Sequence, residues 1–263
     1  MATTSTYLLP YPILTDAVNV HGNIKSLADR LEVVLGTKSN LASPIFTGTV
    51  VTPAGTATSS PLTLTSGTLK TTPVGGSIEY DGDSAYITPD ASAVGGRAVI
   101  PAMHYYRLDA VRSLTNALGV QSLFGVSFTA AASTTYDFEI VTSVNTTGAV
   151  SNSLAFGFGG TAGVTACTYL AVTTNGLANI TPNASSSVLI QTASSTAITA
   201  AVAAATQRVI RISGNIRVST TGTLIPQVSY SAAPGAIPTV LAGSFIKLTP
   251  VASSTTTTIG AWA

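Results

Sequence analysis

Residues 207–220 read QRVIRISGNIRVST, and segments of this kind decide the fold class of the chain. The stretch is rich in Val, Ile and Thr, whose β-branched side chains favour the pleated, half-buried surface of a β-strand. Similar stretches lie on both sides of it, separated by clusters of Gly, Asn, Pro, Ser and Thr that favour turns. We therefore expect β-structure throughout the chain beyond residue 119.

The expected strands are short and follow one another from residue 122 to residue 251. They are SLFGVSFTA (122–130), TYDFEIVTSV (135–144), NSLAFGFGG (152–160), VTACTYLAVT (164–173), SVLIQT (187–192), QRVIRISGNIRVST (207–220), TLIPQVSYS (223–231) and GSFIKLTPV (243–251). About eight short strands in about 140 residues are typical of a β-sandwich or jelly roll. The expected core residues are Phe138, Ile140, Phe156, Phe158, Val209 and Ile212.

Charged side chains are scarce in this chain. Asp, Glu, Lys and Arg make up 8% of its 263 residues, against roughly 25% in an ordinary soluble domain. The apolar fraction of 45% argues against disorder, because disordered chains combine low hydrophobicity with high net charge. Few charges also leave little electrostatic defence against association. A permanent homo-oligomer is therefore expected.

Neither a membrane nor a nucleic acid is an expected partner. The most apolar long stretch, residues 187–212, is interrupted by polar side chains such as Gln191, Gln207 and Arg208, whereas a membrane span needs about 20 predominantly apolar residues. The first residues lack the basic and apolar blocks of a secretory signal. The net charge of +1 provides no electrostatic attraction for nucleic acid.

Few residues are suited to catalysis or to metal binding. His21 and His104 are the only histidines, and Cys167, which we expect to be a buried thiol, is the only cysteine. No nucleophile-elbow, zinc-protease or phosphate-loop motif is present. Asp137 and Glu139 share one face of their strand, about 6.6 Å apart, and could be read as the catalytic carboxylate pair of a glycosidase. Two charged residues on a half-exposed strand explain the pattern at least as well. We expect no enzymatic activity, no metal and no cofactor.

The N-terminal segment is an apolar peptide without helical or strand periodicity. Its two prolines force an extended backbone. Such a peptide fits a groove on another protein or packs on its own domain, and the sequence leaves both open. The segment comprises Tyr7, Leu8, Leu9, Pro10, Tyr11, Pro12, Ile13 and Leu14.

Residues 23–36, NIKSLADRLEVVLG, predict a short amphipathic helix. Asn23 suits the N-cap position and Gly36 the C′ position. Two heptads are too few to establish a coiled coil, so the partner of the helix stays open. Its apolar a/d stripe consists of Ile24, Leu27, Leu31 and Val34.

Residues 37–74 are rich in Thr, Ser, Pro and Gly, with short β-branched pieces between the prolines. Each piece is too short to bury itself within one chain. Three copies wound about an axis would bury the apolar side chains and leave Thr and Ser outside, which predicts a trimeric β stem; a disordered linker is the alternative. The buried residues would be Ile45, Phe46, Val50, Leu62, Leu64 and Leu69.

Two further elements are expected between residues 76 and 119. GSIEYDGDSAYIT (76–88) predicts a hairpin with a type I′ turn at Asp81-Gly82, and its aspartates lack the spacing of a calcium loop. Residues 101–119 predict a second helix that ends at Gly119. One face of that helix would carry Leu108, Val111, Leu114 and Leu118.

Three sets of motifs resemble a known family. They are YLLPYPILTDAVNVHGNIKSLADRLE (7–32); LASPIFTGTV (41–50); and GSIEYDGDSAYIT (76–88) with GRAVIP (96–101), YYRL (105–108), VLAGSFIKLTPV (240–251) and GAWA (260–263). The chain resembles tail-fibre and virion-appendage proteins of tailed bacteriophages, including cyanophages. The resemblance implies a homotrimeric structural protein of the virion, anchored by residues 7–14. It carries one shaft unit instead of several, so any fibre is short.

These expectations divide the chain into four parts. Residues 1–36 form the virion-anchoring arm and helix, residues 37–100 the trimeric β stem with its hairpin, residues 101–119 the second helix, and residues 120–263 a jelly-roll-like β-sandwich. The trimer interface is expected to combine the two apolar helix faces with Ile45 and Phe46 of the stem.

The leading functional hypothesis is a trimeric tail fibre or receptor-binding spike on the tail or neck of the virion. Its partners would be other tail, neck or capsid proteins and a host surface glycan. The alternative is a capsid or collar decoration protein on the head surface that binds no receptor. A bacterial surface adhesin is a third possibility, which the missing export signal argues against.

Two groups of side chains could contact a glycan. Arg208, Arg211 and Arg217 either meet around the threefold axis, face an anionic glycan, or are simply solvated. Tyrosines stack well on sugars, although core or interface positions suit these better. The tyrosines in question are Tyr105, Tyr106, Tyr136, Tyr169 and Tyr230.

Overall fold

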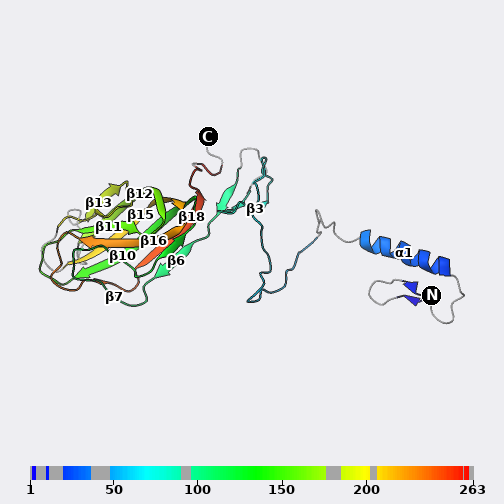
Figure 1. Ribbon diagram of the computed structural model, residues 1–263, viewed down its shortest axis with the longest axis horizontal. Helices are drawn as coiled ribbons and strands as arrows, with labels where there is room; N and C mark the ends of the chain where they lie inside the picture. Colours follow the sequence, from blue (N-terminus) through cyan, green and yellow to red (C-terminus); the bar gives the residue numbers. More distant parts are fainter. Residues whose placement is uncertain are drawn as a thin grey trace. The chain divides into compact units, whose positions relative to one another are not determined.

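The computed structural model describes residues 2–3, 10–11, 20–36, 48–89, 96–175, 185–201, 206–256 and 258–260 (Figure 1). The chain divides into two compact units, Met1–Thr63 and Leu64–Ala263. The predicted fold class is confirmed, since the second unit is built from antiparallel β-sheets and contains a β-sandwich. Within the described ranges, no helix is long and apolar enough to cross a bilayer.

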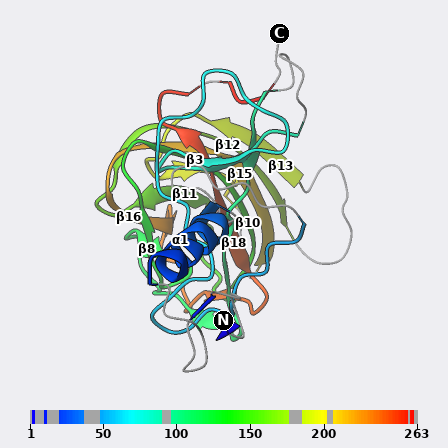
Figure 2. The same ribbon diagram turned by 90° about the vertical axis from the view of Figure 1, so that its right-hand side faces the viewer.

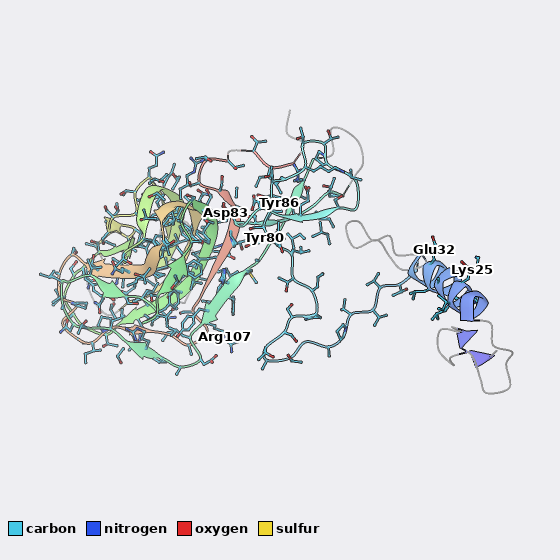
Figure 3. The ribbon with its side chains drawn as sticks, turned by 45° about the vertical axis from the view of Figure 1, so that its right-hand side comes forward. Lys25, Glu32, Tyr80, Asp83, Tyr86 and Arg107 are labelled. Atoms are coloured by element: carbon cyan, nitrogen blue, oxygen red, sulfur yellow. The ribbon has the colours of Figure 1, made fainter. Side chains whose placement is uncertain are left out.

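Helix α1, Val20–Gly36, is the main element of the first unit. The predicted helix is confirmed, but it begins before Asn23, which therefore lies inside it and is not the N-cap. Lys25 Nζ pairs with the Asp29 carboxylate at 2.6 Å, an i,i+4 ion pair that supports an exposed helix face. Figure 3 shows Lys25 and Glu32 projecting from α1.

Two short strands precede α1. β1 (Ala2–Thr3) pairs antiparallel with β2 (Pro10–Tyr11), with Ala2 opposite Tyr11. The remaining residues of the predicted anchoring arm, 7–9 and 12–14, lie outside the described residues, as do Ile45 and Phe46 of the predicted stem. From Gly48 to Thr63 the first unit has no helix or strand.

A three-stranded antiparallel sheet opens the second unit, in the order β3 (Ile78–Tyr80), β4 (Ala85–Ile87) and β5 (Ala98–Ile100). The predicted hairpin is confirmed, but its type I′ turn is wrong. Only Gly82 takes a positive φ, of 105°, and the connection spans residues 81–84. The Asp81 carboxylate shapes this loop by accepting the backbone N–H groups of Asp83 and Ser84 at 2.9 and 2.8 Å, an Asx-type turn.

The helix predicted for residues 101–119 is wrong. Residues 104–107 form β6 (His104–Arg107), which pairs with β18 (Phe245–Ser253), and Arg112–Ser113 form β7. Leu108 N–H donates to Ser244 O at 2.9 Å, and Gly243 N–H donates to Leu108 O at 2.8 Å. Strand pairing with a partner far along the sequence therefore overrides the local helical spacing.

The larger sheet of the sandwich is built around β10 (Thr134–Thr146) and β15 (Thr206–Thr220), and β10 pairs with β15 along its whole length. β12 (Gly163–Asn175) and then β13 (Ser185–Ile190) continue it beyond β15. On the other side of β10 lie β18 and β17 (Thr239–Val240), which β6 and β7 extend. All of these pairings are antiparallel.

The smaller sheet has β16 (Gly222–Tyr230) at its centre. On one side lie β11 (Leu154–Gly159) and β14 (Thr196–Ala197). On the other lie β8 (Gln121–Ser122) and β9 (Phe128–Ala130). Figure 2 shows β8, β11 and β16 as one layer and β10, β15 and β18 as the other.

Aromatic side chains from both sheets fill the core between the layers. Phe138 of β10 meets Phe158 of β11 edge to face with ring centroids 4.9 Å apart. Tyr169 of β12 lies 5.5 Å from Phe156 and donates its hydroxyl to Phe156 O at 3.1 Å. Edge-to-face pairs of this kind stabilise beyond their buried area. Cys167 is buried as predicted, and burial raises the pKa of its thiol to about 12.

The predicted core is confirmed at five of its six positions, and Val209 is the exception. Ile210 and Ile212 are buried, and successive side chains of a strand point to opposite faces. Val209 therefore lies on the outer side of β15, where it is partly exposed. Arg208, next to it, points inward and is fully buried. Gly214, midway along β15, leaves room for β12, because a Cβ there would lie 2.2 Å from Thr168 O.

Candidate functional site

The first half of the chain leaves apolar side chains uncovered by its own residues. On α1, Ile24, Leu27 and Leu31 are 62%, 42% and 45% exposed. Their spacing places them on one face of the helix, and Val34, the fourth member of the predicted stripe, is outside the described side chains. The amphipathic face predicted from the sequence is therefore present and remains partly exposed, although β2 lies next to α1.

The segment after α1 is also uncovered. Residues 48–63 are exposed throughout, including Val51 and Leu62. Its hydrogen bonds are local: Thr56 N–H donates to Ser59 O at 2.9 Å, and Ser59 N–H donates to the Thr56 hydroxyl at 3.1 Å. These contacts form a turn and bury no apolar surface.

The three-stranded sheet has one covered face and one uncovered face. The covered face carries Tyr86, whose hydroxyl donates to the Asp81 carboxylate at 2.9 Å; Tyr80, Asp83 and Tyr86 are labelled in Figure 3. Glu79 lies on the same face and pairs with Arg97 at 2.6 Å. Hydrogen bonds from the Arg97 guanidinium and from Lys70 N–H lower the pKa of the Glu79 carboxyl.

The uncovered face of this sheet is mostly aliphatic and also carries the partly buried Tyr80, which is directly opposite Ala85. Ile78 is directly opposite Ile87, and Ala85 is directly opposite Ile100, so all four side chains point to the same side. Ile78, Ile87 and Ile100 are 55%, 38% and 38% exposed. We call Ile78, Ile87 and Ile100 the isoleucine face.

The residues of the predicted second helix do not share a surface. Leu108 and Leu114 are buried in the core cluster of the sandwich, whereas Val111 and Leu118 are 57% and 60% exposed. Because β6 and the bends that follow it replace the helix, these four side chains no longer form one stripe.

A cavity of about 320 Å³ opens between the two sheets of the sandwich, beside β6. Its inner wall consists of residues from the facing sheets, and Phe158, Leu224 and Leu248 there are almost fully buried. Its rim consists of residues 104–106 of β6 and residues 126–128 at the start of β9. We call this space the edge pocket.

Polar groups lie only at the rim of the edge pocket. His104 packs its ring against Phe128 with centroids 4.8 Å apart, and Tyr106 meets Phe124 edge to face at 6.1 Å. Among the residues that the structure describes, the side chains of Tyr106, Ser127 and His104 have no hydrogen-bond partner. None of the residues that line the pocket is Asp, Glu, Lys or Arg.

The three arginines considered for a threefold or glycan contact do not share one surface of the chain. Arg211 and Arg217 lie on the outer side of β15, and Arg211 pairs with Glu139 at 2.8 Å. Arg208 points into the core, where one of its amino groups donates to Asn152 O at 2.8 Å while Nε and Nη1 have no partner. Burial lowers the pKa of this guanidinium.

The five tyrosines considered for sugar binding also fall into a buried group and an exposed group. Tyr136, Tyr169 and Tyr230 are core residues, whereas Tyr105 and Tyr106 are 52% and 37% exposed at the rim of the edge pocket. The two rim tyrosines were among the residues that the sequence suggested for sugar stacking, but no feature of the sequence indicated the pocket.

The carboxylates of β10 have ordinary partners. Glu139 pairs with Arg211 and, at 3.3 Å, with Lys247, and Asp137 accepts the Asn215 amide at 3.0 Å. Over the ranges the structure covers, no three His, Cys, Asp or Glu side chains gather into a possible metal site.

Comparison with known proteins finds no matching family model, no similar curated protein and no similar solved structure.

Proposed function

We propose that this chain is a non-enzymatic structural protein of a phage virion, a trimeric fibre or spike that anchors by its N-terminus and presents the β-sandwich to the host surface. One observation supports the proposal: α1, residues 48–63 and the isoleucine face expose apolar side chains that the described part of the chain leaves open to solvent. The motif resemblance given above supplies the virion setting and the number of copies.

Identical copies are the simplest cover for these surfaces. In a parallel trimer the residues nearest the threefold axis lie beside their equivalents in the other two chains, so further copies of the chain can cover each of these surfaces. An unrelated partner would have to match an aliphatic helix stripe, an extended segment and a short sheet separately. A three-stranded sheet of such short strands also gains stability from packing on another element.

Light scattering on the purified chain tests the assembly. We expect a mass three times the 26.5 kDa of one chain. A monomer at all concentrations would overturn the trimer and with it the fibre.

Antibody labelling of intact virions tests the location. An antibody against residues 120–263 should label the tail or neck. Label spread over the head would overturn the fibre proposal and favour a capsid decoration protein that binds no receptor.

A further inference from the structure

We propose that the edge pocket binds one neutral sugar ring of a glycan. The inference deepens the proposed function and rests on it only for the biological source of the glycan, the host surface. Binding itself depends on the β-sandwich alone. It can therefore be tested on the purified full-length chain, whether or not that chain is found on a virion tail.

The size of the edge pocket suits a single ring. Its volume of about 320 Å³ lies at the lower end of the range of roughly 300 to 1,000 Å³ found for small-molecule sites. The pocket opens at the sandwich edge, between β6 and the residues before β9. A ring can therefore enter while the rest of a glycan chain stays in solvent.

The lining of the edge pocket favours an uncharged ligand. An ionised group that leaves water without a counter-charge pays a large desolvation cost, and no lining residue supplies one. The cation on β6 is Arg107, which Figure 3 labels. It is already paired with Asp109 at 2.7 Å. Neutral hexoses and N-acetylhexosamines meet this requirement, whereas sialic and uronic acids do not.

The rim of the edge pocket favours a ligand that carries hydroxyl groups. The hydroxyls of Tyr106 and Ser127 and the imidazole of His104 are free to bind a ligand at the mouth. The rings of His104, Phe128 and Phe158 provide aromatic surface next to them. A sugar ring matches both features, since it has C–H groups on its faces and hydroxyls around its edge. A purely apolar ligand would use the walls but not the rim.

Saturation-transfer difference NMR on the full-length chain tests the inference. The probes are the methyl glycosides of glucose, galactose, mannose and N-acetylglucosamine. N-acetylneuraminic acid serves as the charged comparison and indole as the apolar one. We expect saturation transfer to at least one neutral glycoside, to its ring protons most strongly, and much less transfer to N-acetylneuraminic acid.

Rim variants then locate the site. Tyr106→Phe and Ser127→Ala each remove one hydroxyl, and each should weaken binding by roughly 2- to 10-fold, as expected for one neutral hydrogen bond. Ser127→Trp, at an exposed position, should fill the mouth and abolish binding without loss of thermal stability. Tyr80→Phe is the matched control, because it removes a tyrosine hydroxyl that donates to Gly82 O at 2.8 Å, away from the pocket.

Four results would overturn the proposal: no transfer to any neutral glycoside, transfer unchanged in Ser127→Trp, equal transfer to N-acetylneuraminic acid, or transfer to indole alone. None of these results bears on trimer mass or virion labelling. Failure of the pocket and failure of the fibre proposal are therefore distinguishable.

Discussion

At the scale of single residues, Glu79 connects β3 to Lys70, which precedes it in the chain, and to Arg97, which follows it. Its carboxylate accepts Lys70 N–H at 2.8 Å and pairs with Arg97 at 2.6 Å, where both side chains are mostly buried. These bonds favour the ionised form and lower the pKa of Glu79 below its ordinary value of 4.5. The folded chain therefore gives up the proton of the Glu79 carboxyl more readily than the unfolded chain does.

The contribution of Glu79 to stability is present above its unfolded pKa and is lost as the pH falls through the lower, folded pKa. We expect Glu79→Gln to lower the thermal midpoint at neutral pH and to differ less and less from the parent chain below about pH 4.5. Asp137→Asn, at an exposed carboxylate, is the control. A pH-independent difference would contradict the argument.

Arg208 presents the opposite situation, a guanidinium buried without a carboxylate. Two of its three nitrogens lack partners, and burying an unpaired charge is costly. We expect Arg208→Met to leave the free energy of unfolding unchanged or to raise it by about 1 kcal/mol, measured by denaturant titration. Arg211→Met, at an exposed ion pair, should lower it by less than about 1 kcal/mol. A loss of more than about 2 kcal/mol in Arg208→Met would mean that the buried guanidinium stabilises the fold.

At the scale of elements, the isoleucine face yields the clearest prediction about assembly. Fully burying an isoleucine contributes about 1.5 to 3 kcal/mol, and these side chains are already partly covered, so less is available. We expect each of Ile78→Ser, Ile87→Ser and Ile100→Ser to weaken association by about 1 kcal/mol per chain, seen as dissociation at higher protein concentration in analytical ultracentrifugation. Ile237→Ser is the control, because Ile237 is 60% exposed in a loop of the sandwich. Equal effects at all four positions would contradict the assignment.

The elements also show what sequence can and cannot predict. The long strands were recognisable because β-branched residues and turn clusters are local signals, and β10, β12, β15, β16 and β18 lie where they were expected. Residues 101–119 were predicted as a helix because Leu108, Val111, Leu114 and Leu118 have helical spacing. That spacing contains no information about β18, the distant strand that pairs with β6.

The same limit applied to the candidate site. Tyr105 and Tyr106 could be proposed from the sequence as sugar-stacking residues. The edge pocket, however, depends on β6 and β9 lying at neighbouring edges of two different sheets. That arrangement is set by long-range pairing. Arg208 and Val209 show the limit within one strand, because composition identified the strand and only register decided which neighbour points inward.

At the scale of the whole molecule, the two halves of the chain expose their apolar surface differently. The sandwich has a continuous core of its own, so it should fold without a partner. Residues 20–100 instead carry the exposed helix stripe, the segment 48–63 and the isoleucine face. Association should therefore depend on residues before β6, and stability of the sandwich should not.

Deletion of residues 1–103 separates these properties. We expect the remaining chain, which begins at β6, to stay folded by circular dichroism and to run as a monomer in light scattering, while the full-length chain is a trimer. The outer side of the larger sheet is the competing interface, since Leu170 and Leu189 are 43% and 62% exposed there. A shortened chain that remained trimeric would place the interface on the sandwich and contradict the assignment to the residues before β6, and Leu170→Ser in that shortened chain would then test the outer side of the larger sheet.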